Sequence, residues 1–329
     1  MIGMKTATLI DKINALNAEG VRLSGSAAGY NDAFTRHSEA LTLALAGIDV
    51  GGIEPDYATV SAANLAYIFR RRDNDPQTAL GLLSYFFECF DSATFFGGAR
   101  ILEELALIRH YHPRAGSIVN DLKLGYQEIN DAIENYTRAL ENNGETFPEI
   151  VDKPTIQNRL LRSMGIASAI STTLATKVES SDQEFYQRES ITWAQREVDG
   201  RLKAGETAGS ALGGAYHTLG VAQTELADID VAMYDAAKSN LLRAQELAAE
   251  RPMVQSVLRL RLAWLNYRAK PEETRDETRE LLDAVLQDQD TPARWDAGVH
   301  QALRDQLTIL GAHLGEGYTT RITNMYTSQ

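Results

Sequence analysis

The stretch GAYHTLGVAQTELADIDVAMYDAAKSNLLRAQELAAERP, from Gly214 to Pro252, decides the fold class. Each half of it carries residues at helical spacing that share one face. These are Tyr216, Leu219, Gly220 and Gln223 in the first half, and Ala237, Leu241, Ala244 and Leu247 in the second. Small residues on both faces allow the two backbones to approach closely. The stretch therefore predicts two helices folded back on each other as a hairpin.

The composition of the whole chain agrees with a helical protein. Ala, Leu, Glu, Gln and Arg are abundant and runs of β-branched residues are scarce, which predicts an all-α fold. A length of 329 residues suits about two compact domains or one array of stacked repeats. The formal net charge of −13 opposes attraction to a phosphate backbone, so we expect no nucleic-acid partner.

Signals for a membrane or for secretion are absent from the sequence. No apolar stretch approaches the roughly 20 residues that span a bilayer, and the N-terminal MIGMKTATLI lacks the pattern of a signal peptide. The single cysteine, Cys89, cannot form an internal disulfide, which fits a reducing compartment. We expect a cytoplasmic protein with no membrane partner.

Proline residues divide the chain into helical segments, because proline suits the first turn of a helix and breaks its interior. The expected helices cover residues 6–23, 29–45, 56–72, 75–90, 92–112, 113–141, 155–178, 180–204, two segments within 214–252, 253–269, 272–286 and 293–314. We expect N-terminal helical repeats over 1–144, a loop over 145–153, and C-terminal repeats with a capping helix over 154–314. A tail over 315–329 follows, and the two sets of repeats are alternatively one continuous array.

An internal repeat supports this architecture. NDAFTRHSEAL at residues 31–41 matches NDAIENYTRAL at residues 130–140, with Asn-Asp-Ala opening and Ala-Leu closing both segments at identical spacing. In each segment an aromatic residue or a histidine follows the first alanine by four positions. Such self-similarity is typical of repeat proteins, in which each unit buries its apolar face against its neighbours.

These residues resemble the tetratricopeptide repeat, a family that pairs a helix carrying Leu-Gly with a helix carrying spaced alanines and an aromatic. The matching positions are Tyr216, Leu219 and Gly220 in a first helix, Leu65 and Ala66 in another, and Ala132, Tyr136, Ala139, Ala237, Leu241 and Ala244 in second helices. The resemblance is to the looser solenoids of bacterial sensor and regulator proteins. It implies a right-handed α-solenoid of antiparallel helical hairpins.

The resemblance also implies where a ligand binds, because in that family the first helix of each pair lines a concave groove that holds a peptide. Projected onto this sequence, the groove residues are Asn64, Tyr67, Arg71, Arg159, Arg162, His217, Arg261, Trp264 and Arg268. Two triplets within this set have the spacing i, i+3, i+7, so each forms one stripe along a helix.

Arginine and aromatic residues in such a groove suit an acidic ligand. The guanidinium group matches a carboxylate with paired donors, and tyrosine and tryptophan add stacking surface. We expect a protein or peptide partner with an acidic segment or a C-terminal carboxylate. The alternative is that these arginines lie on solvated helix faces and form ion pairs within their own helices.

Two further stretches invite a functional interpretation. The aromatic run from Tyr85 to Phe96 holds more aromatic residues than one helical face can bury, so it packs between repeats or forms a homodimer contact. In His110-Tyr111-His112 the two histidines do not share a helical face, and we expect no metal site there.

No recognisable catalytic or phosphate-loop motif occurs, and we expect no cofactor. A binding or scaffold module is therefore the expected function. The alternatives are a peptide-responsive sensor of the bacterial repeat type, an all-α enzyme with a central pocket containing His217, and a structural subunit assembled through the aromatic run.

Overall fold

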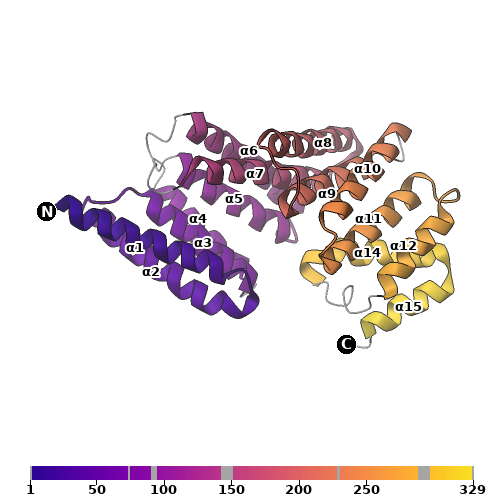
Figure 1. The fold of residues 1–329 in the computed structure, drawn as a ribbon, viewed down its shortest axis with the longest axis horizontal. Coiled ribbons are helices and arrows are strands. Elements are labelled where there is room, and N and C mark those ends of the chain that lie inside the picture. The colour runs from indigo at the N-terminus through magenta and orange to yellow at the C-terminus, as the bar shows by residue number, and fades with distance from the viewer. Residues whose placement is uncertain are drawn as a thin grey trace. The chain divides into compact units, whose positions relative to one another are not determined.

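A computed structural model describes residues 2–72, 75–89, 95–141, 151–227, 230–287 and 297–327. Over these ranges the regular elements are all helical and none is a strand, which confirms the predicted all-α class (Figure 1). The helices are α1 (Ile2–Leu23), η1 (Ala27–Gly29), α2 (Tyr30–Asp49), α3 (Asp56–Arg72), α4 (Pro76–Cys89), α5 (Phe95–Tyr111), α6 (Ile118–Glu141), α7 (Lys153–Ala175), α8 (Ser180–Lys203), α9 (Ser210–Thr224), α10 (Val231–Leu247), α11 (Pro252–Ala269), α12 (Arg275–Gln287), α14 (Ala297–Leu314) and α15 (Glu316–Thr327).

The contacts divide the chain into two compact units, Met1–Ala167 and Ser168–Gln329. The division falls within α7, whereas the sequence placed a loop over 145–153 between two sets of repeats. Most of that loop lies outside the described residues, and α7 begins at its last position, Lys153.

In the N-terminal unit, helices that follow one another along the chain pack together. Helix α1 packs against α2, α2 against α3, α3 against α4 and α5 against α6, and α3 also packs along α5. A shared core runs through the first five helices and includes Ile13 of α1, Leu83 of α4 and Ile101 of α5. Helices that are neighbours in the sequence are therefore also neighbours in space in this half.

The pattern of buried residues on α4 and α6 follows the helical period. Helix α4 buries Ala79, Leu83 and Phe86, which recur at helical spacing. Helix α6 is one continuous helix, but it begins at Ile118 and not at Pro113. The turn before it is held by Asp121, whose carboxylate accepts hydrogen bonds from the backbone and guanidinium of Arg114.

Helix α5 differs from its neighbours because it is buried almost all round, from Phe96 to Ile108. It sits very close to α3 at Gly97, whose backbone N–H donates to Asp56 Oδ1 over 3.0 Å. A Cβ atom at Gly97 would lie 2.3 Å from Thr59 Oγ1, so only glycine allows this approach. A helix enclosed in this way must pair every charged side chain that it carries.

The C-terminal unit repeats the hairpin arrangement, with α9 against α10 and α11 against α12. The predicted close approach occurs at Gly220, where a Cβ atom would lie 2.7 Å from Leu241 Cγ. Leu241, Ala237 and Ala244 are all buried in the core that α10 shares with α11.

Within the stretch expected as a tail, Glu316–Thr327 forms helix α15. Gly315, with φ of +116°, permits the turn between α14 and α15. Ile322 and Met325 of α15 are then buried in the same core as Leu307 and Leu310 of α14. This helix is hard to recognise in the sequence because only Ile322 and Met325 are fully buried on it, while Tyr318 and Tyr326 are partly buried against the same core. Among the described residues, no helix combines the length and the apolar character that crossing a bilayer requires.

Candidate functional site

A buried cluster of charged side chains lies at the centre of the N-terminal unit, on α5. Glu103 is fully buried, and its carboxylate contacts three arginines. Arg100 Nη1 of the same helix lies 3.1 Å from Oε2, while Arg159 Nη1 and Arg162 Nη1 of α7 lie 3.3 Å and 3.4 Å from Oε1. The hydroxyl of Tyr136 on α6 donates to Oε2 over 2.8 Å. One carboxylate therefore connects α5, α6 and α7.

The electrostatics of the cluster keep Glu103 charged. Burial raises the pKa of Glu103, but the charges of Arg159, Arg100 and Arg162 outweigh it and lower the pKa to about 2. Burial also raises the pKa of Tyr136, so its hydroxyl keeps its proton and remains a donor. The pKa of Arg159 is lowered, chiefly by the positive charge of Arg100. Arginines in this cluster thus repel one another as well as attracting Glu103.

A second ion pair adjoins the first. Arg70 Nη2 of α3 lies 3.1 Å from Glu104 Oε2, and both side chains are almost fully buried. Arg70 Nε is buried without a hydrogen-bond partner among the described residues. The two carboxylates of α5, Glu103 and Glu104, therefore hold four arginines between them.

A chain of amide and imidazole contacts continues from Arg100 to the first hairpin. Arg100 Nη2 donates to Asn64 Oδ1 over 3.4 Å, and Asn64 Nδ2 donates to Asn17 Oδ1 over 3.4 Å. His37 Nδ1 lies 3.0 Å from the same oxygen of Asn17. Burial, with a contribution from the charge of Arg100, lowers the pKa of His37 to about 4. His37 is therefore neutral at pH 7, with Nδ1 as the donor.

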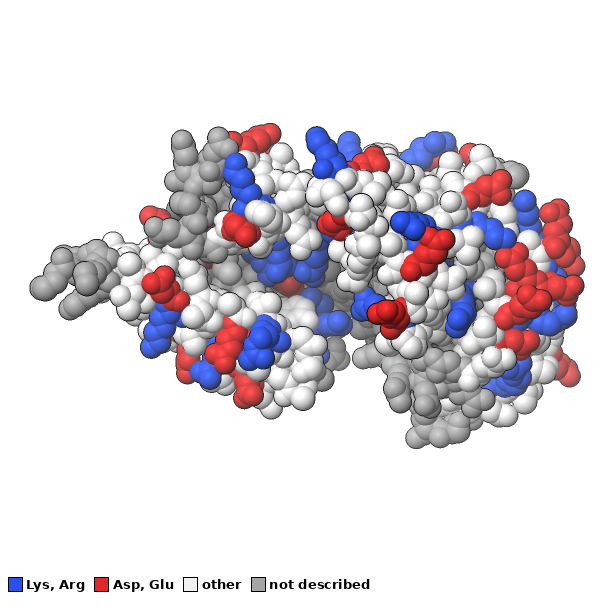
Figure 2. All heavy atoms as spheres, in the orientation of Figure 1, with Lys and Arg blue, Asp and Glu red and all other residues white. Residues whose placement is uncertain are grey.

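Two cavities open beside this cluster. The larger has a volume of about 620 Å³ and lies against α1, α3, α5 and the start of α7. The smaller, of about 210 Å³, is lined by Val21, Ser24, His37, Asn64, Tyr67, Arg100, Glu104, Arg159 and Arg162. The two share Val21, Asn64, Arg100 and Arg159, so they are adjoining parts of one hollow. Lys and Arg side chains gather there with little acidic surface between them (Figure 2).

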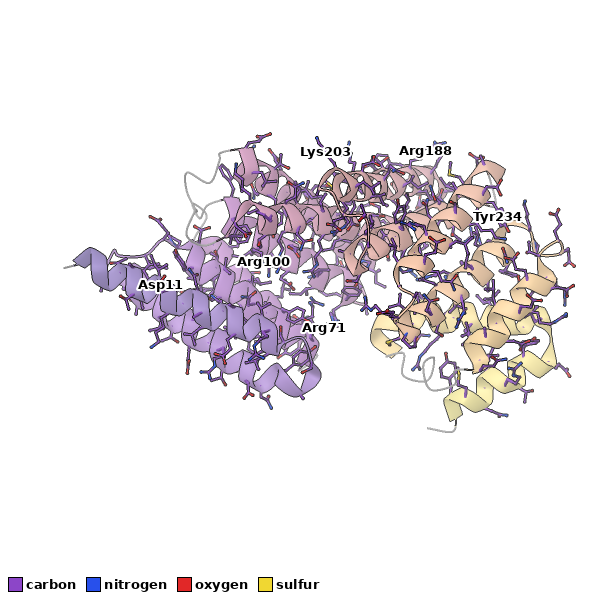
Figure 3. The ribbon with its side chains drawn as sticks, viewed as in Figure 1. Asp11, Arg71, Arg100, Arg188, Lys203 and Tyr234 are labelled. Carbon is purple, nitrogen blue, oxygen red and sulfur yellow. The ribbon has the colours of Figure 1, made fainter. Side chains whose placement is uncertain are left out.

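Five of the nine groove residues expected from the sequence belong to this region of the N-terminal unit. Asn64, Tyr67, Arg159 and Arg162 line the smaller cavity. Arg71 does not line it but is exposed at the end of α3 (Figure 3). Burial acts to lower the pKa of Arg71, but the hydrogen bond with Tyr67 and the charge of Tyr67 help to raise it. Arg159 and Arg162 pair with Glu103 of another helix, so the alternative of ion pairs within one helix does not describe them.

The other four expected residues lie in the C-terminal unit, around α9 and α11. Arg268 Nη1 lies 3.1 Å from Glu225 Oε2, and Arg261 Nη1 donates to Gln306 Oε1 over 2.9 Å. Trp264 stacks at a tilt on Tyr267, with ring centroids 5.4 Å apart. Both arginines therefore already contact residues outside α11, whereas the ring contact of Trp264 is within its own helix.

His217 lies near Arg261 and is neutral. Burial, followed by the charge of Arg261, lowers the pKa of His217 to about 3. Burial also lowers the pKa of Arg261 to about 10, although the charge of Glu225 opposes this. His217 Nε2 and Trp264 Nε1 are buried without hydrogen-bond partners among the described residues.

The sequence analysis overlooked the residues at the centre of the cluster, Arg100, Glu103 and Glu104. The signal was present in FFGGARILEELALIRHY, where apolar residues occupy every side of the helix. A helix that is apolar all round is buried, and charged residues within it must be paired with partners from other helices. Sequence alone identifies such residues as buried and paired, but it does not identify their partners.

The internal repeat has a structural counterpart in this site. His37 of α2 and Tyr136 of α6 occupy the same position in the two matching segments. Each is buried, and each makes a polar contact with the first helix of its own hairpin, His37 with Asn17 of α1 and Tyr136 with Glu103 of α5. The repeated position therefore supplies a polar contact on the side where the cavities lie.

The aromatic region from Tyr85 to Phe96 is only partly exposed. Phe86 and Phe96 are buried, whereas Tyr85 is 62% and Phe87 40% exposed on the outer face of α4. Cys89 is exposed and unpaired. Residues 90–94 lie outside the described residues.

No group of three or more His, Cys, Asp or Glu side chains is placed to hold a metal ion within the parts of the chain that the structure describes. Comparison with known proteins gave no family model and no curated protein that matches the chain. The function is therefore argued from the site itself.

Proposed function

We propose that the chain is a peptide-binding module that captures an acidic segment of a protein partner against the N-terminal cluster. The segment lies in the cavity of about 620 Å³ and directs a carboxylate toward Arg159, Arg162 and Arg100. The single observation that carries this proposal is the excess of arginine over carboxylate around a hollow in a protein of net charge −13. No bond is made or broken.

The N-terminal unit is favoured over the C-terminal one by the state of its arginines. Arg162 is 44% exposed and makes one ion pair, at 3.4 Å, and Arg71 is exposed. In the C-terminal unit, Arg268 and Arg261 each have a polar partner at about 3 Å. A guanidinium with unused donors in a hollow gains most from an incoming carboxylate.

The finer architecture is also part of the proposal. We infer that the hairpins stack as a right-handed solenoid similar to tetratricopeptide repeats, with α1, α3, α5 and α7 along the ligand side. The packing of α3 against both α4 and α5 supports this, because the first helices of neighbouring hairpins meet in such an array.

The test is the binding of a fluorescein-labelled hexaglutamate peptide with a free C-terminal carboxylate, measured by anisotropy on the full chain. Labelled hexaglutamine is the uncharged control, because a cationic peptide would be attracted to a protein of net charge −13. We expect Arg162→Glu to weaken binding by roughly tenfold or more, since it reverses a charge in the cavity wall. Arg71→Glu, at the end of α3, should weaken binding less, because Arg71 lines neither cavity. The matched control is Arg138→Glu, because Arg138 is an exposed arginine of α6 that pairs with Glu134 and lines neither cavity.

The outcomes separate the two units. Loss of binding in Arg268→Glu alone would move the site to the C-terminal unit. Unchanged affinity in Arg71→Glu, Arg162→Glu and Arg268→Glu together would remove the peptide-binding proposal.

A further inference from the structure

Charge in the N-terminal cluster is not balanced. Arg70, Arg100, Arg159 and Arg162 carry four positive charges, and Glu103 and Glu104 carry two negative ones, so two positive charges remain among the described residues of the cluster. His37 adds none, because its lowered pKa keeps it neutral at pH 7. A single carboxylate would neutralise only half of this excess.

Glu103 holds the two arginines of α7 in place, but it does not use all of their hydrogen-bond donors. Arg159 and Arg162 share one oxygen, Glu103 Oε1, at 3.3 Å and 3.4 Å. Ion pairs with good geometry are shorter, about 2.7–2.9 Å between nitrogen and oxygen. Each guanidinium carries five N–H donors, so with respect to the described residues both retain donors that an incoming anion can use. Glu103 fixes their position in advance, which lowers the ordering cost of binding.

The donors surround the smaller cavity from different helices. Arg100 approaches from α5, Arg159 and Arg162 from α7, and Tyr67 from α3. Donors on several sides suit a tetrahedral oxyanion, whose oxygens point in four directions, better than a planar carboxylate. The volume of about 210 Å³ is below the roughly 300 Å³ at which cavities for whole drug-sized ligands begin. It therefore takes one group, while the adjoining cavity takes whatever carries that group.

We propose that the smaller cavity binds a tetrahedral dianion of the phosphomonoester class, held by Arg100, Arg159 and Arg162. This inference rests on the proposed function, because it names the group that the acidic ligand places in the same hollow. Glu104 also lines the cavity and forms an ion pair with Arg70. Its negative charge offsets the positive charge of Arg70, so the net charge of the cluster is +2.

The experiment is isothermal titration of the full chain at pH 7.5 and matched ionic strength, with inorganic phosphate and with acetate as probes. We expect phosphate to bind at least roughly tenfold more tightly than acetate, because it neutralises both charges. Arg159→Ala and Arg162→Ala should each weaken phosphate binding by roughly tenfold. Arg138→Ala is the control and should leave it unchanged.

A second variant separates a role in binding from a role in folding. Glu104→Gln removes a negative charge from the cavity wall, so a folded Glu104→Gln protein should bind phosphate a few-fold more tightly. A variant that is merely damaged would bind it more weakly. Circular dichroism establishes that the variant is folded. Equal affinity for acetate and phosphate, an unaffected Arg162→Ala protein, or weaker binding by folded Glu104→Gln would each overturn the inference.

Peptides distinguish the source of the phosphoryl group. A pentapeptide with phosphoserine between pairs of glutamates should bind more tightly than inorganic phosphate if the group is carried by a peptide. Tighter binding of free phosphate would assign the cavity to a small phosphate-bearing ligand. If phosphate binds but no peptide does, the peptide-binding proposal fails and this inference stands. If the unphosphorylated peptide binds as well as the phosphorylated one, this inference fails and the proposed function stands.

Discussion

Glu103 shows how one buried side chain organises its surroundings. Its carboxylate is fully buried and is contacted by polar groups of α5, α6 and α7. These contacts take the place of the water that would otherwise solvate the charge. Removing the charge leaves three guanidiniums without their common partner, and their mutual repulsion is then uncompensated.

We expect Glu103→Gln to lower the free energy of unfolding by about 3 kcal/mol, the usual cost of breaking a buried ion pair. The measurement is urea unfolding followed by far-ultraviolet circular dichroism. Glu184→Gln is the matched control, since Glu184 is 66% exposed and pairs with Arg188 one turn along α8. Its effect should stay within roughly 0.5 kcal/mol, and equal effects of the two substitutions would contradict the importance of burial at Glu103.

His37 makes the N-terminal unit sensitive to acid. Its pKa of about 4 in the folded protein lies below the ordinary 6.5, because the buried ring disfavours the charged form. The unfolded chain therefore binds more protons as the pH falls. Stability is complete above about pH 6.5 and decreases toward pH 4.

Between pH 7 and pH 5 this one group should remove about 2 kcal/mol of stability from the N-terminal unit. His37→Gln keeps a donor for Asn17 but does not titrate, so the loss should be smaller by that amount. Hydrogen exchange of the α1 and α2 amides at the two pH values measures it. Identical losses in the parent and the variant would show that His37 does not cause the sensitivity.

At the scale of helices, glycine positions set how closely neighbouring helices pack. Gly97 and Gly220 lie where a Cβ atom would collide with the facing helix. Gly214, one turn and a half before Gly220 on α9, has no atom within 4 Å of the position that a Cβ would occupy. The same helix thus contains one glycine required by packing and one that is not.

We expect Gly220→Ala to destabilise the C-terminal unit by roughly 1–3 kcal/mol, because α10 must move away at Leu241. Gly214→Ala should be neutral or stabilise by up to about 1 kcal/mol, since alanine favours the helix. Thermal unfolding of both variants gives the comparison. Equal melting temperatures would mean that α9 and α10 do not need this close approach.

For the whole molecule, the net charge of −13 opposes the local attraction of the arginine cluster for an anion. The repulsion from the entire surface reaches about 30 Å at 0.01 M salt but only about 8 Å at 0.15 M. The cluster acts only at short range, in a partly buried hollow where salt screens it less.

Association of the labelled hexaglutamate should therefore become faster as salt is raised from about 0.01 M to about 0.15 M, because the long-range repulsion is screened. Stopped-flow anisotropy at constant pH measures the rate constant. A rate that falls steeply with salt would show that the local positive field dominates even at a distance, contrary to this expectation.

Periodicity in the sequence was sufficient to predict the described α-helices other than α15. The helix expected over 75–90 is α4. The two helices expected within Gly214–Pro252 pack together, with Gly220 against Leu241. The helix at Glu316–Thr327 escaped because its inner face has few apolar residues, and those are buried only after α14 is in place.

The candidate site was only half predictable. Asn64, Tyr67, Arg159 and Arg162 were found from their places in the repeat, and they do line one cavity. Arg100, Glu103 and Glu104 were missed, although they hold the arginines in position. Their role depends on contacts between residues more than 30 positions apart, such as Tyr136 with Glu103.

By itself, the sequence determined that this protein is helical and where most of its helices begin and end. These properties arise from neighbours within a few turns, where periodicity and glycine act directly. Only the tertiary structure decided that Glu103 would gather Arg100, Arg159 and Arg162 beside a cavity. Charge balance in a buried cluster depends on which distant side chains share the same low-dielectric volume, and spacing along the chain does not record that.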